Sequence, residues 1–270
     1  MKNVLFVDCC IRREASNTRK LAKAFLSALP SDCAVTRLDL MAEDLSYFKD
    51  SYFDQREALL AENRRDHPRF RYAHQFAQAD LIVIAAPFHL HAHFAKRALK
   101  AGKHVLSETS TNVTLAEGVE LFRAAEESGL CYMLAENYCY TRFSQEFKRL
   151  YDAGEIGEVR YAEGQYNHPM DIEHSLWYSP GTKHWRNWLP GTYYDTHALA
   201  PLMYVTGTMP VAVSCSLFGR GRDGYKGRGY VMLIKMDNGA IFRTYGGAAG
   251  HDCAYSFHGT VGAMECVRGH

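Results

Sequence analysis

The sequence has no long apolar run, no strong excess of charge and no pair of cysteines at metal-ligand spacing. Its 31 Lys and Arg residues balance 30 Asp and Glu residues, so we expect no electrostatic attraction to nucleic acid or to a membrane surface. No apolar stretch approaches the roughly 18 residues that a membrane span needs. These absences favour an ordinary globular protein with a small molecule as its partner.

The eight cysteines are scattered along the chain. Disulfide frameworks occur mainly in small secreted domains, so we expect reduced thiols in a cytoplasmic protein and no metal held by cysteine. The opening MKNVLFVDCC has too short an apolar stretch for a signal peptide and is interpreted as a first strand.

Strand and helix signals alternate up to about residue 135. Residues 81–86 are apolar throughout, which suits a central strand covered on both faces. Thr114-x-x-Glu117 is a capping box that opens a helix, and Gly129 ends that helix. Such an alternation predicts an α/β domain with a doubly wound parallel sheet, whose ligand lies at the carboxyl ends of the strands.

The pattern changes after residue 135. A long strand is predicted at 159–167 and a helix at 194–204, followed by several strands in succession. Asp237-Asn238-Gly239 predicts a hairpin turn between two of these strands. We therefore expect a nucleotide-binding α/β domain over residues 1–135 and an α+β domain over residues 136–270, with an open, mostly antiparallel sheet.

Residues 89–270 resemble the Gfo/Idh/MocA family of oxidoreductases. The similarity is carried by HLHAHFAKRALKAGKHVLSE, AGEIGEVRYAEGQYNHP and THALAPLMYVTGTMP. This resemblance implies hydride transfer to or from a sugar, polyol or related carbinol, with NAD or NADP as the cofactor. It also implies a second domain that is shorter than the family's usual one, and a homodimer formed through the C-terminal sheet.

Residues 1–88 depart from that family. The first turn, from Cys9 to Thr18, contains no glycine, whereas a dinucleotide-binding turn needs glycines so that the pyrophosphate can approach. VLFVDCCIRREASNTRKLAKAFL and FRYAHQFAQADLIVIAAPF instead resemble flavodoxin-like NAD(P)H-dependent FMN or quinone reductases. That resemblance implies FMN as an alternative cofactor, with its phosphate held by Ser16, Asn17 and Thr18 at a helix N-terminus. The hybrid predicts one continuous five-stranded sheet of order 2-1-3-4-5, flavodoxin-like over 1–88 and Rossmann-like over 89–135.

The resemblance to the Gfo/Idh/MocA family also implies catalytic and cofactor-binding residues. His197 matches the family's catalytic histidine, and Tyr193 occupies the position where the family often has an aspartate. Glu108 matches the glutamate of the Glu-Lys-Pro motif, although Thr109 replaces the lysine. Pro87 and His91 match the turn that lines the nicotinamide. Hydride transfer needs such an acid/base group beside the hydroxyl.

Further candidates follow from the same resemblance. Cofactor and substrate residues are expected to include Asn137, Tyr138, Tyr140, His168, Trp185 and Arg186. The alternation of His89, His91 and His93 does not predict a metal site, because residues i and i+2 point to different sides of a helix. Three hypotheses stay open: an NAD(P)-dependent oxidoreductase, an FMN-binding reductase, and a non-catalytic hybrid of a recombined or truncated gene that retains nucleotide binding.

Overall fold

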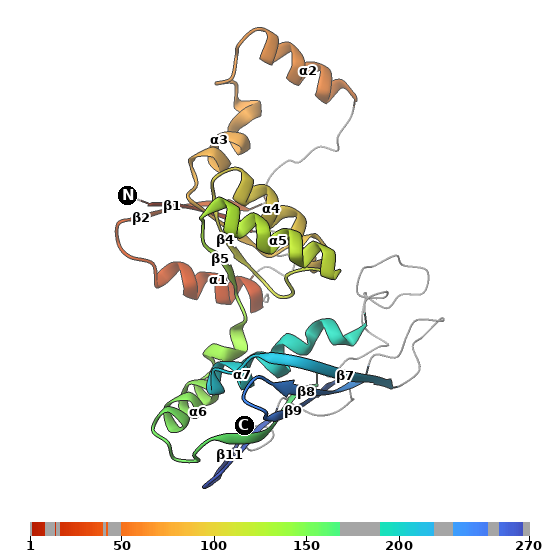
Figure 1. The fold of residues 1–270 in the computed structure, drawn as a ribbon. Helices are drawn as coiled ribbons and strands as arrows, with labels where there is room; N and C mark the ends of the chain where they lie inside the picture. Colours follow the sequence, from red (N-terminus) through yellow and green to blue (C-terminus); the bar gives the residue numbers. More distant parts are fainter. Residues whose placement is uncertain are drawn as a thin grey trace. The chain divides into compact units, whose positions relative to one another are not determined.

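A computed structural model of the 270-residue chain (Figure 1) describes residues 2–8, 14, 17–39, 42, 50–167, 190–218, 229–247 and 254–266. The chain divides into two units, Met1–Ala135 and Glu136–His270. Each unit contains its own sheet and its own hydrophobic core, and each is described by itself.

The first unit is built on a five-stranded sheet in the order β2-β1-β3-β4-β5, in which every pairing is parallel. Its strands are β1 (Lys2–Asp8), β2 (Cys33–Asp39), β3 (Leu81–Ile84), β4 (His104–Ser107) and β5 (Tyr132–Leu134). The third strand lies beside the first, as the hybrid sequence predicts. The fold class expected for this part of the chain is therefore confirmed.

Helices connect these strands. They are α1 (Asn17–Ser27), α2 (Asp50–Ala61), α3 (Arg71–Gln78), α4 (His91–Lys100) and α5 (Leu115–Ser128), with the 3-10 turns η2 (Pro68–Phe70) and η3 (Phe88–Leu90). Helix α5 begins at the expected capping box, where the Thr114 hydroxyl accepts from the Glu117 N–H at 3.2 Å. It ends at Gly129, whose φ of 63° is in the left-handed region. Figure 1 shows α4 and α5 side by side over the sheet.

The second unit has a six-stranded sheet in the order β11-β10-β6-β9-β8-β7. Its strands are β6 (Val159–Tyr166), β7 (Pro210–Phe218), β8 (Gly229–Met236), β9 (Ile241–Gly246), β10 (Ala254–Gly259) and β11 (Ala263–Glu265). Strands β6 and β9 are parallel and the other pairs are antiparallel, so the expected open, mostly antiparallel sheet is confirmed. The turn at Asp237–Gly239 joins β8 to β9 as a hairpin.

Helices α6 (Arg142–Asp152) and α7 (Asp195–Thr206) complete this unit, with the turns η4 (Asn137–Tyr140) and η7 (Gly191–Tyr194) before them. Helix α7 packs across β6 and β9. The approach is close: a Cβ at Gly164 of β6 would lie 2.1 Å from the Ala198 carbonyl oxygen of α7. Glycine at this position therefore lets the helix backbone reach the sheet. No helix in the described ranges has the length and apolar character that crossing a bilayer requires.

Candidate functional site

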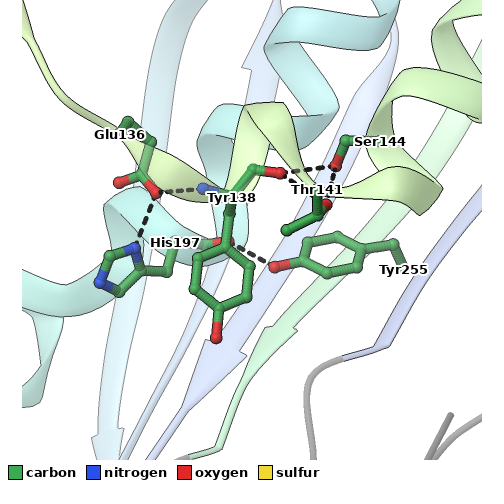
Figure 2. A network of polar contacts seen from close by, with 6 residues as sticks. All are labelled: Glu136, Tyr138, Thr141, Ser144, His197 and Tyr255. Carbon is green, nitrogen blue, oxygen red and sulfur yellow. Dashed lines mark hydrogen bonds and ion pairs between the residues drawn. The ribbon is translucent and has the colours of Figure 1, made fainter. Parts of the chain in front are cut away.

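A buried carboxylate and a buried imidazole meet in the second unit (Figure 2). Glu136 follows β5 and caps η4, where its Oε1 accepts from the Tyr138 N–H at 3.1 Å. The same oxygen lies 2.8 Å from Nδ1 of His197, the third residue of α7. Glu136 is 4% exposed and His197 is 7% exposed, so this pair lies largely out of solvent.

The partner of Nδ1 fixes the tautomer of His197. An ionised carboxylate can only accept hydrogen bonds, so Nδ1 carries the proton that it donates to Glu136. In the neutral ring Nε2 then keeps its lone pair and can take a proton from a ligand. The carboxylate also stabilises the imidazolium that forms when Nε2 is protonated. This geometry is that of a general base with an orienting carboxylate.

Three tyrosine rings surround the His197 imidazole. Their centroids lie 4.9 Å (Tyr138), 4.5 Å (Tyr166) and 6.0 Å (Tyr194) from the centroid of the imidazole ring. Tyr166 and Tyr194 are stacked at 6.0 Å, and Tyr138 meets Tyr166 edge-on at 5.6 Å. Aromatic walls around a few fixed polar groups are typical of sites for small organic ligands.

Hydrogen bonds to the main chain hold both sides of this site. The Tyr255 hydroxyl donates to the His197 carbonyl oxygen at 2.6 Å (Figure 2). The Ser144 and Thr141 hydroxyls donate to the Tyr138 carbonyl oxygen at 2.7 and 2.9 Å. The backbone segments that carry the imidazole and the Tyr138 ring are therefore held by contacts from β10 and from the start of α6.

A second ionisable group lies close in sequence to His197. Asp195, the first residue of α7, is 7% exposed, and burial raises the pKa of its carboxyl to about 6. The hydroxyls of Thr244 and Tyr230 oppose this rise. Burial, followed by the Asp195 charge, raises the pKa of the Tyr230 phenol in turn. The second unit thus contains a second buried acidic centre besides Glu136.

The nicotinamide-side residues expected from the sequence lie at the carboxyl ends of β3 and β4 in the first unit. His91 is fully buried, with Nδ1 2.8 Å from the Ser110 carbonyl oxygen and Nε2 2.7 Å from the Ala86 carbonyl oxygen. The Glu108 N–H donates to the Ile84 carbonyl oxygen at 2.9 Å. His91 therefore ties together the two loops that follow these strands, where nucleotides bind in doubly wound sheets.

The described residues next to the first turn of this sheet are the start of α1 and the end of β2. Asn17 and Thr18 begin α1, whose N-terminal N–H groups suit a phosphate. Arg19, in the same turn, is buried and lies 3.5 Å from Asp39 at the end of β2. An acidic residue at that strand end holds the adenosine ribose in dinucleotide-binding sheets, but here the carboxylate faces an arginine.

The other residues predicted from the sequence differ in their location and exposure. Asn137 and Tyr140 lie exposed on η4, and the Tyr140 ring packs 6.1 Å from that of Tyr204. Tyr193 is half-buried in η7, and its N–H donates to the Pro190 carbonyl oxygen at 3.3 Å. Ser16, His168, Trp185 and Arg186 fall outside the described residues. Within the described ranges, no group of three or more His, Cys, Asp or Glu side chains is placed to hold a metal ion.

Glu136 and Tyr166 were not among the site residues expected from the sequence. The signal for Glu136 is a carboxylate directly after a strand of the parallel sheet, at the edge where ligands bind. Tyr166 carries no comparable signal, because a tyrosine at the end of a strand is ordinary. Tyr194 was expected, together with Tyr193, as a possible source of a phenol beside His197, and its ring lies 6.0 Å from that of His197.

Comparisons with known proteins agree with the division of the sequence into a front segment, residues 1–88, and a following segment, residues 89–270. Residues 2–92 match the model of a family with a flavodoxin-like fold. A glycosyl hydrolase family 109 protein from Phocaeicola vulgatus is 28% identical over 180 residues, which are 62% of this chain and 43% of that protein. A dTDP-3,4-didehydro-2,6-dideoxy-alpha-D-glucose 3-reductase from Streptomyces violaceoruber is 40% identical over 92 residues, 33% of this chain and 26% of the reductase. The chain thus spans less than half the length of these curated relatives.

Solved structures share the fold of both units. Scyllo-inositol dehydrogenase from Lactobacillus casei, solved with NAD(H) and scyllo-inositol, has a TM-score of 0.67 and 15% identity, over 98% of this chain and 76% of the dehydrogenase. An oxidoreductase from Pseudomonas syringae has a TM-score of 0.69 and 16% identity, over 98% and 70% of the two chains. The chain therefore combines a front segment that matches a family with a flavodoxin-like fold with the two-unit fold of these dehydrogenase and oxidoreductase structures.

Proposed function

We propose that the protein is an NAD(P)-dependent oxidoreductase that transfers hydride to or from a sugar, polyol or related carbinol. The observation that carries this proposal is the buried Glu136–His197 pair inside a ring of tyrosines. The inositol dehydrogenase fold and the sugar reductase among the relatives support the same chemistry. The substrate hydroxyl would meet Nε2 of His197.

The tautomer of His197 determines how this residue would transfer a proton. In the oxidative direction, Nε2 of His197 takes the hydroxyl proton while the carbinol carbon loses its hydride, and Glu136 stabilises the imidazolium through Nδ1–H. In the reductive direction the imidazolium returns that proton to the carbonyl oxygen. A bound nicotinamide would supply the hydride acceptor or donor. Pro87, His91 and Glu108 would border its ring, and α1 would hold its phosphates.

Substrate recognition is assigned to the aromatic walls. Tyr138, Tyr166 and Tyr194 offer ring faces against which the C–H face of a sugar-like ring can pack. Oε2 of Glu136 is buried and has no hydrogen-bond partner among the described residues, so it can accept from a substrate hydroxyl. Asn137 would lie at the exposed rim of this pocket.

The test is a nucleotide titration followed by a polyol screen. Purified protein is titrated with NADH, NADPH and FMN, and then assayed with NAD or NADP and a panel of sugars and inositols. We expect His197→Ala to lower kcat by about 100-fold or more, because it removes the base. Glu136→Gln should also lower kcat, because the amide does not favour the same tautomer, and should raise KM, because an NH2 group takes the place of one acceptor oxygen.

The matched control is His258→Ala, which removes an exposed histidine of the same unit. It should leave turnover unchanged. Full turnover in His197→Ala, or tight binding of FMN with no binding of NADH or NADPH, would refute the proposal. The FMN outcome would assign the nucleotide site to the chemistry that the match over residues 2–92 suggests.

A second candidate is hydrolysis of a glycosidic bond. Several relatives carry the name glycosyl hydrolase family 109 protein, at 28% to 32% identity. A buried carboxylate beside an imidazole also suits acid/base catalysis at a glycoside. Release of a chromogenic aglycone, measured with and without added NAD, distinguishes this activity from simple carbinol oxidation.

Two further features belong to the same proposal. A homodimer through the C-terminal sheet is supported by exposed apolar side chains on neighbouring strands, Leu233 of β8 and Ile241 of β9. A cytoplasmic setting is supported by the free thiols of the described cysteines, which are Cys33, Cys131, Cys139, Cys215 and Cys266. Light scattering of the purified protein tests the first, and cell fractionation tests the second.

A further inference from the structure

A polar hollow lies on the face of the second sheet that points away from α7. Gly164 of β6 faces the α7 backbone, so Glu163 and Gln165, its neighbours along the strand, point to the opposite face. A hollow of about 220 Å³ lies on that face beside β6, β10 and β11, and both residues line it. Ala254 of β10 pairs with Gln165, and its small side chain leaves this space unfilled.

Two carboxylates flank one serine across three strands of this face. Ser256 of β10 pairs with Glu163 of β6 on one side and with Glu265 of β11 on the other, and all three residues line the hollow. Directly paired residues of neighbouring strands project to the same face, with Cβ atoms about 5 Å apart. Both carboxylates are therefore within reach of one group that binds beside the Ser256 hydroxyl.

Only one of these two carboxylates has a cation beside it. The Arg243 guanidinium donates to Oε2 of Glu163 at 2.8 Å, and the Tyr161 hydroxyl donates to Oε1 of Glu163 at 2.6 Å. Glu265 is exposed and pairs with no basic side chain in the part of the chain that the structure describes. Two carboxylates and one guanidinium leave one negative charge at the hollow without a counter-ion.

The hollow also has a buried acceptor that lacks a donor. Gln165 is 4% exposed, and its Oε1 has no hydrogen-bond partner among the described residues. The N–H of Tyr255, which also lines the hollow, already donates to Sγ of Cys266 at 3.0 Å. The Ser256 hydroxyl lies 3.3 Å from Nε2 of His258. Buried polar atoms are almost always paired, so a ligand with N–H donors fits this arrangement of acceptors.

We propose that this hollow binds a small primary ammonium compound through its NH3+ group. The three N–H donors match the Glu265 carboxylate, the Ser256 hydroxyl oxygen and the Gln165 carbonyl oxygen, and the positive charge matches the remaining negative charge. A divalent metal fits less well, because no three His, Cys, Asp or Glu side chains of the described residues are grouped to hold one. The site lies on the other face of the sheet from His197 and does not depend on the proposed function.

The test compares two isomeric cations by calorimetric titration of the purified protein at constant ionic strength. Butylammonium has three N–H donors, whereas tetramethylammonium has the same atoms and charge and no N–H. We expect butylammonium to bind at least tenfold more tightly, because the site pairs with donors and not with charge alone. Equal affinities, no binding of butylammonium, or tighter binding of Mg²⁺ than of butylammonium would overturn the proposal.

Substitutions locate the binding site. Glu265→Gln and Gln165→Met should each weaken butylammonium binding about tenfold, because each removes one acceptor. Glu146→Gln is the matched control, since it removes an exposed carboxylate paired with Arg149 on α6 of the same unit, and it should bind as wild type does. His197→Ala should also bind as wild type does. Glu265 is exposed, so Glu265→Gln carries the test if Gln165→Met does not fold. Wild-type affinity in Glu265→Gln, or an equal loss in Glu146→Gln, would show that the hollow is not the site.

A spectroscopic signal from the hollow itself completes the test. In nitrogen-labelled protein, the side-chain NH2 signal of Gln165 is assigned by its loss in Gln165→Met. Butylammonium should shift this signal in wild type, and tetramethylammonium should leave it in place. If butylammonium binds and the Gln165 signal does not move, the ammonium compound binds elsewhere and the proposal is wrong.

Discussion

Replacing Asp195 by asparagine should stabilise the second unit at neutral pH. Burial raises the pKa of the Asp195 carboxyl from its ordinary value of 3.8 to about 6, against the opposing influence of Thr244 and Tyr230. Each pKa unit corresponds to about 1.4 kcal/mol between the two protonation states, so a rise of about two units amounts to about 3 kcal/mol. Asparagine has nearly the same shape and carries no charge, so we expect the variant to gain up to about 3 kcal/mol in free energy of unfolding.

The gain should appear only over a defined range of pH. Because the folded pKa lies above the unfolded one, the folded chain holds the proton more tightly, and wild type loses stability as the pH rises from 3.8 through about 6. Below that range the carboxyl is neutral in both states, so wild type and variant should be equally stable. Above it the full difference should be present and constant.

Urea unfolding followed by circular dichroism measures this difference. Asp152→Asn is the control, since an exposed ion pair contributes about 1 kcal/mol or less at any pH. Parallel stability curves for wild type and Asp195→Asn from acidic to neutral pH would refute the reasoning, because the carboxyl would then carry no burial penalty.

Three further substitutions test the scaffold. Gly164→Ala places a methyl group 2.1 Å from the Ala198 carbonyl oxygen, so urea unfolding should show a loss of about 1–3 kcal/mol and kinetics a fall in kcat as α7 shifts. Thr114→Ala removes the N-cap of α5 and should cost about 1 kcal/mol in thermal unfolding followed by circular dichroism. His91→Phe removes the ring nitrogens that lie beside the Ala86 and Ser110 carbonyl oxygens, so nucleotide fluorescence should show weaker NADH binding.

Much of the local structure could be predicted because its causes are local. The capping box at Thr114 and the left-handed Gly129 mark the two ends of α5, and each needs only a few neighbouring residues. The hairpin at Asp237–Gly239 follows from its turn residues. The apolar strand over 81–84 is central, as a continuous apolar run indicates.

The features that could not be predicted from the sequence depend on contacts between distant segments. Strand β11 has three residues and exists because it pairs with β10, so it has no pattern of its own. The parallel pairing of β6 with β9 joins residues about 80 positions apart and carries no local signal. The same holds for the site, since Glu136 and His197 are 61 residues apart and only the fold brings them together.

The two units contain separate sets of polar contacts. The base, its orienting carboxylate, the tyrosine walls and the hydrogen bonds that fix them all lie within Glu136–His270. The two loops that His91 contacts lie within Met1–Ala135, and so does the N-terminus of α1. On the proposed function, a change in the front segment should alter which nucleotide binds without altering the geometry of the Glu136–His197 pair. Cofactor choice and proton transfer should accordingly respond to different substitutions, with His91→Phe affecting nucleotide affinity and Glu136→Gln affecting kcat.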